Sequence, residues 1–426
     1  MPRRIAIIGA GIGGLAAAWR AHRTGAEVVV FEASDRLGGT IQSEQHGEWL
    51  IERGPHTLQM RPDVADIIAA LPIKPLVAGD GRRLNRYVVR GGRLVPLPMG
   101  PGSLLFTNFF SGRSKFRLAR LIAGKTEPPS EDESFADFVR RQCGEEVLTW
   151  AAQPFVSGIY AGNPELLSTE YAFPRLWAAL KQRRSALGGS GAAPLISFPN
   201  GLTEVVNALA EPLPFSALRL KTIVQGLVRN GGRWRIEDLS EAGEFDEVLV
   251  SLPAKAASGL RIDGDYPLRF LEAIPHPPVT VLNVGFRRSD VRHPLDGFGF
   301  LVPSVERRLI MGVIFTSTLF PGRAPSGHVA MTVMLGGALQ PDCAKLTEAD
   351  AWQAAQVDVR ELLGVSAATP AFLEATHYES AIPQYTLAHG ELLQKMKAAE
   401  SAHSGLWLGG NYRGGISLPD RLNQTV

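Results

Sequence analysis

The sequence predicts an α/β fold, α+β over the whole chain, with a domain built on a parallel sheet, a β-rich domain and a helical domain. Two observations lead to this prediction. Residues 5–32 read as strand, glycine turn, helix and second strand, the unit from which parallel sheets are built. Later segments alternate with the two-residue period of strands, whereas parts of residues 97–189 carry apolar side chains at helical spacing.

The glycine turn follows the apolar run 5–8 and opens the helix. Gly9 makes the turn, Gly11 has no side chain to block a pyrophosphate, and Gly14 allows close packing of helix and strand. Free N–H groups at the helix start bind phosphates, and Glu32, after the second apolar run, can accept hydrogen bonds from ribose hydroxyls. This context favours a dinucleotide site over an ordinary loop. Its expected contacts are Gly9, Ala10, Gly11, Ile12, Gly13, Gly14 and Glu32.

The residues after Glu32 select the dinucleotide. The stretch ASDRLGGT places an acid and an arginine before a glycine pair. This extension resembles FAD-containing oxidoreductases of the amine oxidase superfamily, and nicotinamide dehydrogenases usually lack it. The resemblance implies a Rossmann-like domain that binds FAD non-covalently. Further expected FAD contacts are Ala33, Arg36, Gly38, Gly39 and Thr40, and the backbone of the turn Gly54, Pro55, His56 and Thr57. The alternative for His56 is a purely structural ring.

Composition fits a large enzyme. The 426 residues, 45% of them hydrophobic, allow two or three domains with their own cores. A formal net charge of +2 predicts no nucleic-acid partner. Cys143 and Cys343 cannot form a disulfide framework, and no Cys/His cluster predicts a metal. Since we find neither a cleavable leader nor about 18 consecutive apolar residues, we expect a cytoplasmic protein.

Two further segments each have two possible interpretations. Residues 85–98 read as a hairpin that turns at Gly91-Gly92, and Arg86 at its start either grips a substrate carboxylate or is a solvated edge charge. Residues 102–125 combine an aromatic cluster with a basic amphipathic helix. This helix either lies on an anionic membrane surface, which makes the protein peripheral on the inner face of the cell membrane, or packs into a helical domain of its own.

The stretch PFVSGIYAGNPELLS at residues 154–168, which reads as turn-rich, closely resembles a segment of protoporphyrinogen oxidases. NRYVVRGGRLVPLP, LVPS at 301–304, TVMLGG at 332–337, IPQYT at 382–386 and GLWLGGNYRGGISL at 405–418 extend the resemblance over nearly the whole chain. The family's reaction implies six-electron oxidation of protoporphyrinogen IX by FAD and molecular oxygen in haem biosynthesis, with hydrogen peroxide as by-product. We find no convincing general base or other catalytic side chain.

The resemblance also implies roles for single residues. Arg86 matches a propionate-binding arginine, Leu301 and Ile314 the residues on either side of one pyrrole ring, Met334 a stacking residue, and Gly158 a backbone contact to the macrocycle. The remaining cofactor contacts implied are Val224 beside the adenine, and Asn411, Ile416, Ser417 and Leu418 in the last motif. Asn163 departs from the family, which usually has Asp there.

The implied domains are discontinuous: FAD binding at 1–80, 200–258 and 391–426, substrate binding at 81–96, 190–199 and 259–390, and a helical domain at 97–189. Alternatives stay open. The same scaffold can oxidise coproporphyrinogen III, and a partner protein can bind flavin and pass porphyrin onward without chemistry. Amine oxidase and carotenoid desaturase activities fit the substrate-side motifs less well. The oligomeric state is open, a homodimer included.

Overall fold

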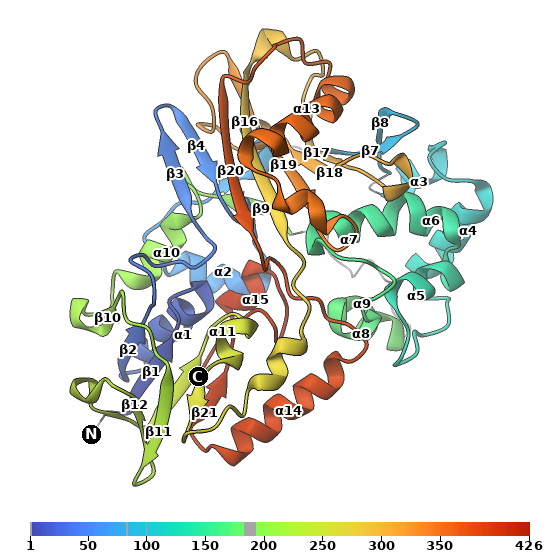
Figure 1. The fold of residues 1–426 in the computed structure, drawn as a ribbon. Helices are drawn as coiled ribbons and strands as arrows, with labels where there is room; N and C mark the ends of the chain where they lie inside the picture. Colours follow the sequence, from blue (N-terminus) through green and yellow to red (C-terminus); the bar gives the residue numbers. More distant parts are fainter. Residues whose placement is uncertain (1, 82–83, 99, 183–192) are drawn as a thin grey trace.

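The computed structural model describes residues 2–81, 84–98, 100–182 and 193–426 (Figure 1). Residues 1, 82–83, 99 and 183–192, which belong to the predicted segments 1–80, 81–96, 97–189 and 190–199, lie outside the described residues. Figure 1 shows three parts: a layered α/β part that holds both termini, a sheet of long strands above it, and a group of helices beside that sheet.

The α/β part is organised on a five-stranded parallel sheet, which confirms the predicted strand, helix and strand at the N-terminus. Segments far apart in the sequence supply its strands, because each parallel neighbour needs a crossover connection. In sheet order the strands are β10 (Leu218–Arg219), β2 (Glu27–Phe31), β1 (Arg4–Ile8), β14 (Glu247–Val250) and β21 (Leu406–Leu408).

Both faces of this sheet are buried, as the near-continuous apolar runs of its strands require. One face packs against helices that include α1 (Ile12–Arg23), α2 (Pro62–Ala69), α10 (Thr203–Ala210) and α15 (Leu418–Leu422). The other face is covered by two helices and a four-stranded sheet: α11 (Ala254–Ser258), α14 (His389–Ala402), β13 (Glu244–Phe245), β12 (Arg233–Ile236), β11 (Gly226–Asn230) and β15 (Arg261–Ile262).

The long strands form a seven-stranded mixed sheet. Its order is β20 (Phe372–Tyr378), β16 (Val279–Arg287), β19 (His328–Gly336), β18 (Ile310–Ile314), β17 (Gly297–Leu301), β7 (Asn85–Arg90) and β8 (Arg93–Pro96). The predicted hairpin of β7 and β8 is confirmed. One face packs on α13 (Glu348–Leu363). The short α12 (Thr316–Leu319) contacts β17 and β19. On the other face, Asn283 and Gly285 of β16 contact the hairpin of residues 43–52 through Glu52 and Trp49.

The helical part has a core of its own, made largely of aromatic and branched side chains. Its helices are α3 (Pro101–Phe106), α4 (Gly112–Ile122), α5 (Phe135–Gln142), α6 (Glu145–Val147), α7 (Gln153–Tyr160), α8 (Thr169–Ala172) and α9 (Pro174–Lys181). Gly158, expected in a turn, lies inside α7, and the chain turns only at Ala161, whose φ is +50°. Among the described helices, none has the length and apolar character needed to span a bilayer.

Two smaller sheets connect these parts. β3 (Ser43–His46) and β4 (Trp49–Glu52) form a hairpin. β9 (Leu195–Ser197) lies between β5 (Leu58–Gln59) and β6 (Leu76–Val77), and Ile196 belongs to the core around α1. The domain boundaries stay a proposal, and this pairing favours placing β9 with the parallel-sheet domain rather than with the substrate-binding domain.

Candidate active site

The carboxyl ends of the parallel strands meet at one edge of the sheet, and the predicted dinucleotide residues follow them directly. A side chain on Gly9 would lie 2.5 Å from the Ser251 carbonyl oxygen, and one on Gly14 would lie 2.0 Å from the carbonyl oxygen of Gly9. A side chain on Gly11 would meet nothing within 4 Å. Two glycines are therefore needed for packing, whereas the third leaves open space at the start of α1, where a pyrophosphate can approach the N–H groups.

Glu32 lies beside this turn. Its carboxylate accepts hydrogen bonds from the Ala10 N–H at 2.9 Å and from the Ser34 hydroxyl at 2.8 Å. The Gly38 N–H donates to the Ala10 carbonyl at 2.8 Å, and the Arg36 guanidinium donates to the Gly39 carbonyl at 2.6 Å. These bonds fold the segment after β2 onto the glycine turn.

Three further predicted FAD contacts follow at the same edge of the parallel sheet: Val224, Thr40 and Gly54. Backbone bonds join the chain before Val224 to the end of β2, since the Thr222 N–H donates to the Glu32 carbonyl at 2.8 Å. A Cβ on Gly54 would lie 2.0 Å from the Thr40 carbonyl oxygen, so the turn of residues 54–57 packs closely on the loop after β2. Contact of these residues with a cofactor stays a prediction.

His56 belongs to that turn and reaches the seven-stranded sheet. The Asn283 amide donates to the Glu52 carbonyl at 3.0 Å, and the Thr332 hydroxyl donates to the Asn283 side-chain oxygen at 2.8 Å. The Thr332 oxygen must then accept from His56 Nε2, 2.8 Å away. Burial lowers the pKa of His56 to about 4, helped by the nearby Arg323 guanidinium. The ring is therefore neutral at pH 7, with its proton on Nε2.

The predicted substrate residues share one face of the seven-stranded sheet. Register aligns Arg86 with Gly299, Gly299 with Ile314, and Ile314 with Thr332. The next row with the same orientation aligns Val88, Leu301, Gly312 and Met334. Side chains that point the other way, Phe300, Val313 and Val333, are buried against α13. Leu301, Ile314 and Met334 are only partly buried, so the four predicted residues line an accessible face.

Helix α7 lies against this face. A Cβ on Gly158 would lie 2.3 Å from Leu301 Cδ2, which places the helix backbone against the predicted wall. Arg86 lies over the Phe298 ring at 5.0 Å, and burial lowers the pKa of its guanidinium. Within the described ranges, Arg86 has no carboxylate within salt-bridge distance. A desolvated guanidinium without an internal anion suits a carboxylate ligand.

A family model described as flavin containing amine oxidoreductase matches residues 12–417. The chain belongs to the flavin-containing amine oxidoreductase family. This confirms the resemblance stated from the sequence. Protoporphyrinogen oxidase of Homo sapiens is 30% identical over 99% of this chain and 96% of its own length. Coproporphyrinogen III oxidase of Bacillus subtilis (strain 168) is 27% identical over 99% of this chain and 96% of its own length.

A solved structure has the same fold. The crystal structure of a putative protoporphyrinogen oxidase from Exiguobacterium sp. 255-15 matches with a TM-score of 0.82 at 23% identity and covers 100% of this chain and 97% of the other. Membership in the flavin-containing amine oxidoreductase family implies a flavin, and the residues present fit one. Gly11 leaves the phosphate approach open, and Glu32 lies at the tip of β2 where a ribose is expected.

The last predicted motif of this family member surrounds the turn between β21 and α15. The Ser417 side chain accepts from the Asp420 N–H and caps α15, a helix of five residues. Ile416 packs against the helical core, whereas Leu418 packs against the core around α1. Asn411 offers its carbonyl to the Tyr385 hydroxyl at 2.7 Å. The motif thus lies where the α/β and helical parts meet.

Some polar residues near the site had no clear sequence signal. Glu52 is 4% exposed, and burial raises its pKa to about 7 despite hydrogen bonds from Ser43 and the Leu202 N–H. Arg323 is also buried, and it donates to Ser197 and the Phe198 carbonyl. Glu52, His56, Asn283 and Arg323 line one internal cavity. A polar residue inside an apolar run, such as Asn283 in VTVLNVGF, was the available hint.

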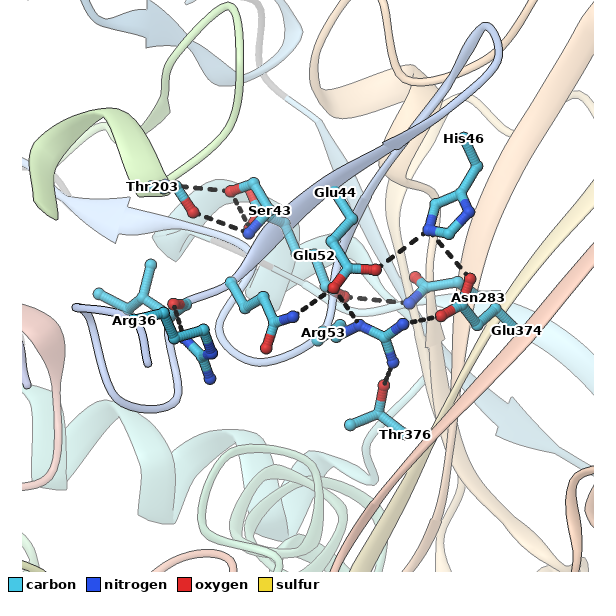
Figure 2. Close-up of polar contacts among 12 residues, drawn as sticks. Arg36, Ser43, Glu44, His46, Glu52, Arg53, Thr203, Asn283, Glu374 and Thr376 are labelled. Carbon is cyan, nitrogen blue, oxygen red and sulfur yellow. Dashed lines mark hydrogen bonds and ion pairs between the residues drawn. The ribbon is translucent and has the colours of Figure 1, made fainter. Parts of the chain in front are cut away.

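Next to this cavity, Arg53 joins the β3–β4 hairpin to edge strand β20 (Figure 2). Its guanidinium forms ion pairs with Glu44, at 2.8 Å, and with Glu374, and it donates to the Thr376 hydroxyl at 3.1 Å. His46 Nε2 lies 3.1 Å from a carboxylate oxygen of each glutamate. Glu44, His46 and Glu374 are close enough to hold a metal ion, but the Arg53 guanidinium already forms ion pairs with both carboxylates.

Proposed function

We propose that this protein is an oxygen-dependent protoporphyrinogen IX oxidase that contains FAD and acts in haem biosynthesis. The observation that carries the proposal is the placement of Arg86, Leu301, Ile314 and Met334 on one partly exposed sheet face. Gly158 closes this face from the helical side, and the turn carrying His56 reaches it through Thr332. The full-length similarity to protoporphyrinogen oxidases supports the substrate class.

The proposed reaction removes six hydrogen atoms from the macrocycle in three rounds. In each round a hydride leaves one carbon bridge, a proton leaves the macrocycle, and one oxygen molecule becomes hydrogen peroxide. Bound FAD supplies the hydride acceptor and passes the electrons to oxygen. In this proposal Arg86 pairs with a propionate, Leu301 and Ile314 hold a pyrrole ring between them, and Met334 stacks on another.

Coproporphyrinogen III is the second candidate substrate, favoured by the similarity to the Bacillus subtilis enzyme. Coproporphyrinogen carries four carboxylates and protoporphyrinogen two. In the two register rows that form the face, Arg86 is the one cationic residue among the described positions. A face with one guanidinium suits the substrate with fewer carboxylates, which is why protoporphyrinogen comes first.

The decisive experiment compares the two porphyrinogens directly. The purified flavoprotein is supplied in air with each substrate, and porphyrin fluorescence and peroxide are followed together. We expect faster oxidation of protoporphyrinogen, with three peroxides per porphyrin. Preference for coproporphyrinogen would favour the second candidate. A bound flavin without porphyrinogen-dependent peroxide would overturn the oxidase proposal and favour the non-catalytic porphyrin-transfer role.

We also propose that α3 and α4 contact an anionic membrane surface from the cytoplasmic side. Phe109, Phe110, Leu118 and Leu121 pack into the helical core, but Leu105, Phe106 and Phe116 are 67%, 83% and 66% exposed. The same stretch of chain carries five cationic residues: Arg113, Lys115, Arg117, Arg120 and Lys125. Exposed aromatic side chains among cations are typical of helices that lie in a lipid interface.

Vesicle sedimentation tests this surface. Binding to phosphatidylcholine vesicles that contain phosphatidylglycerol is expected to fall when Phe106 and Phe116 are both changed to Ser. Phe215→Ser is the matched control, because Phe215 is 94% exposed but lies between α10 and β10. Equal binding by wild type and both variants would remove the proposal.

A further inference from the structure

We propose that Tyr385 is a positioning residue that sets the shape of the predicted flavin-binding turn of residues 410–417. Its hydroxyl donates to the Asn411 carbonyl at 2.7 Å and accepts from the Gly415 N–H at 3.1 Å. One side-chain atom thus bridges two peptide groups near the two ends of the turn. The inference rests on flavin binding by this chain and not on which porphyrinogen it oxidises.

The turn needs such a bridge because its backbone is unusual. Gly410, Gly414 and Gly415 have φ values of +92°, +72° and +110°, in the region that favours glycine. A glycine-rich segment loses much conformational freedom when it adopts a single shape. The hydrogen bond that the Tyr385 hydroxyl donates to Asn411 and the one that it accepts from Gly415 hold these two residues at a defined separation. Ile416 and Ser417, two of the predicted flavin contacts, follow immediately.

Tyr385 is itself held firmly. The side chain is 4% exposed, and its ring stacks on His389 with centroids 4.1 Å apart and planes inclined by 14°. Its backbone carbonyl accepts from the Ser168 N–H at 2.8 Å. Burial raises the pKa of Tyr385 to about 12, so the hydroxyl keeps its proton and remains a donor at neutral pH.

Gln384, the residue before Tyr385, contacts the helix that lies against the predicted substrate face. The Gln384 side-chain amide donates to the Tyr160 carbonyl at 2.8 Å, and Tyr160 is the last residue of α7, the helix that places Gly158 against Leu301. Residues 384–385 therefore contact the helix on the substrate side and the turn on the flavin side. Tyr385 thereby holds the flavin turn at a set position relative to α7.

The test compares Tyr385→Phe with Tyr412→Phe. Tyr412 lies in the same turn and is fully buried, but its hydroxyl has no hydrogen-bond partner among the described residues. Both variants remove one buried hydroxyl from the same region, and only the first breaks the bridge. We expect Tyr385→Phe to raise the FAD dissociation constant of the apoprotein about tenfold, as for the loss of one to two hydrogen bonds.

Tyr412→Phe should change the FAD dissociation constant less than twofold, in keeping with the loss of an unpartnered hydroxyl. The visible flavin spectrum and the flavin midpoint potential should shift in Tyr385→Phe alone. The thermal midpoint of each apoprotein is measured in parallel. Equal FAD affinities and spectra for the two variants would overturn the proposal, and so would loss of FAD by Tyr385→Phe that only follows a collapse of the apoprotein. If both variants behave as expected but the protein does not oxidise porphyrinogens, the proposed function fails and the inference about Tyr385 stands.

Discussion

Gly158 and Leu301 meet where helix α7 crosses strand β17, and a Cβ on Gly158 would lie 2.3 Å from Leu301 Cδ2. A glycine inside a helix costs about 1 kcal/mol relative to alanine, so its presence in α7 calls for a packing reason. The contact supplies that reason. It also ties the helical part to the face on which Arg86, Ile314 and Met334 lie.

Gly158→Ala should alter substrate binding more than stability. The atom it meets is the end of a flexible side chain, so Leu301 can rotate away, but this movement reshapes the predicted pyrrole wall. We expect KM for the porphyrinogen to rise by about tenfold, equivalent to roughly 1.4 kcal/mol, with FAD content unchanged. Gly112→Ala in α4, where an added Cβ meets nothing within 4 Å, is the control. Similar kinetics for both variants would place Gly158 outside the substrate site.

Arg86→Ala should weaken substrate affinity without loss of flavin. Loss of a charge-assisted, bidentate contact is expected to raise KM by about tenfold or more. Arg86→Lys keeps the charge but not the planar fork, so its KM should fall between those of wild type and Arg86→Ala. Steady-state kinetics and the flavin-to-protein absorbance ratio measure both effects. Parallel loss of flavin and affinity would mean that Arg86 only supports the fold.

Glu52 makes stability depend on pH. Burial raises its folded-state pKa to about 7, whereas an unfolded chain releases this proton near pH 4.5. The folded protein therefore binds the proton more tightly, and the stability that results is complete below pH 4.5 and lost as pH rises to about 7. The full change is on the order of 3 kcal/mol.

Glu52→Gln, which stays neutral, should lack this fall in stability. Thermal midpoints of FAD-saturated wild type and Glu52→Gln, compared between pH 5 and pH 8, measure it. The wild-type midpoint should fall relative to that of the variant as pH rises. If the thermal midpoints of both proteins change equally with pH, ionisation of Glu52 does not lower the stability of the folded protein.

Arg53→Met should destabilise the junction between the β3–β4 hairpin and β20. The substitution leaves the carboxylates of Glu44 and Glu374 without their shared cation, at an expected cost of about 1–3 kcal/mol. Arg140→Met is the matched comparison, because Arg140 also contacts several carboxylates but at an exposed site, where about 0–1 kcal/mol is expected. Unfolding midpoints measured at low salt compare the stability lost in the two variants. Equal losses of stability would contradict the prediction.

Local sequence patterns were sufficient to predict the first strand, helix and strand of the parallel-sheet domain. In residues 5–32 the apolar runs, the glycine spacing and the terminal acid lie within one short segment, and the structure has the predicted strand, helix and strand there. The β7–β8 hairpin was equally clear because its turn residues and its strands are adjacent in the chain. Gly158 shows the limit: Gly158, Gly162 and Pro164 suggested a turn, but the helix stays intact through Tyr160, with Gly158 packed on β17.

Only the tertiary structure could bring Glu52, His56, Asn283 and Thr332 into one hydrogen-bonded chain. Glu52 and His56 are more than two hundred positions from Asn283 and Thr332. Pairing of such distant segments leaves no periodic trace in the sequence. The sequence motifs thus define the dinucleotide turn and, through resemblance, the family. Strand register decides which side chains share the substrate face, because each strand alternates sides and a shift by one residue would turn Arg86 and Met334 away from it.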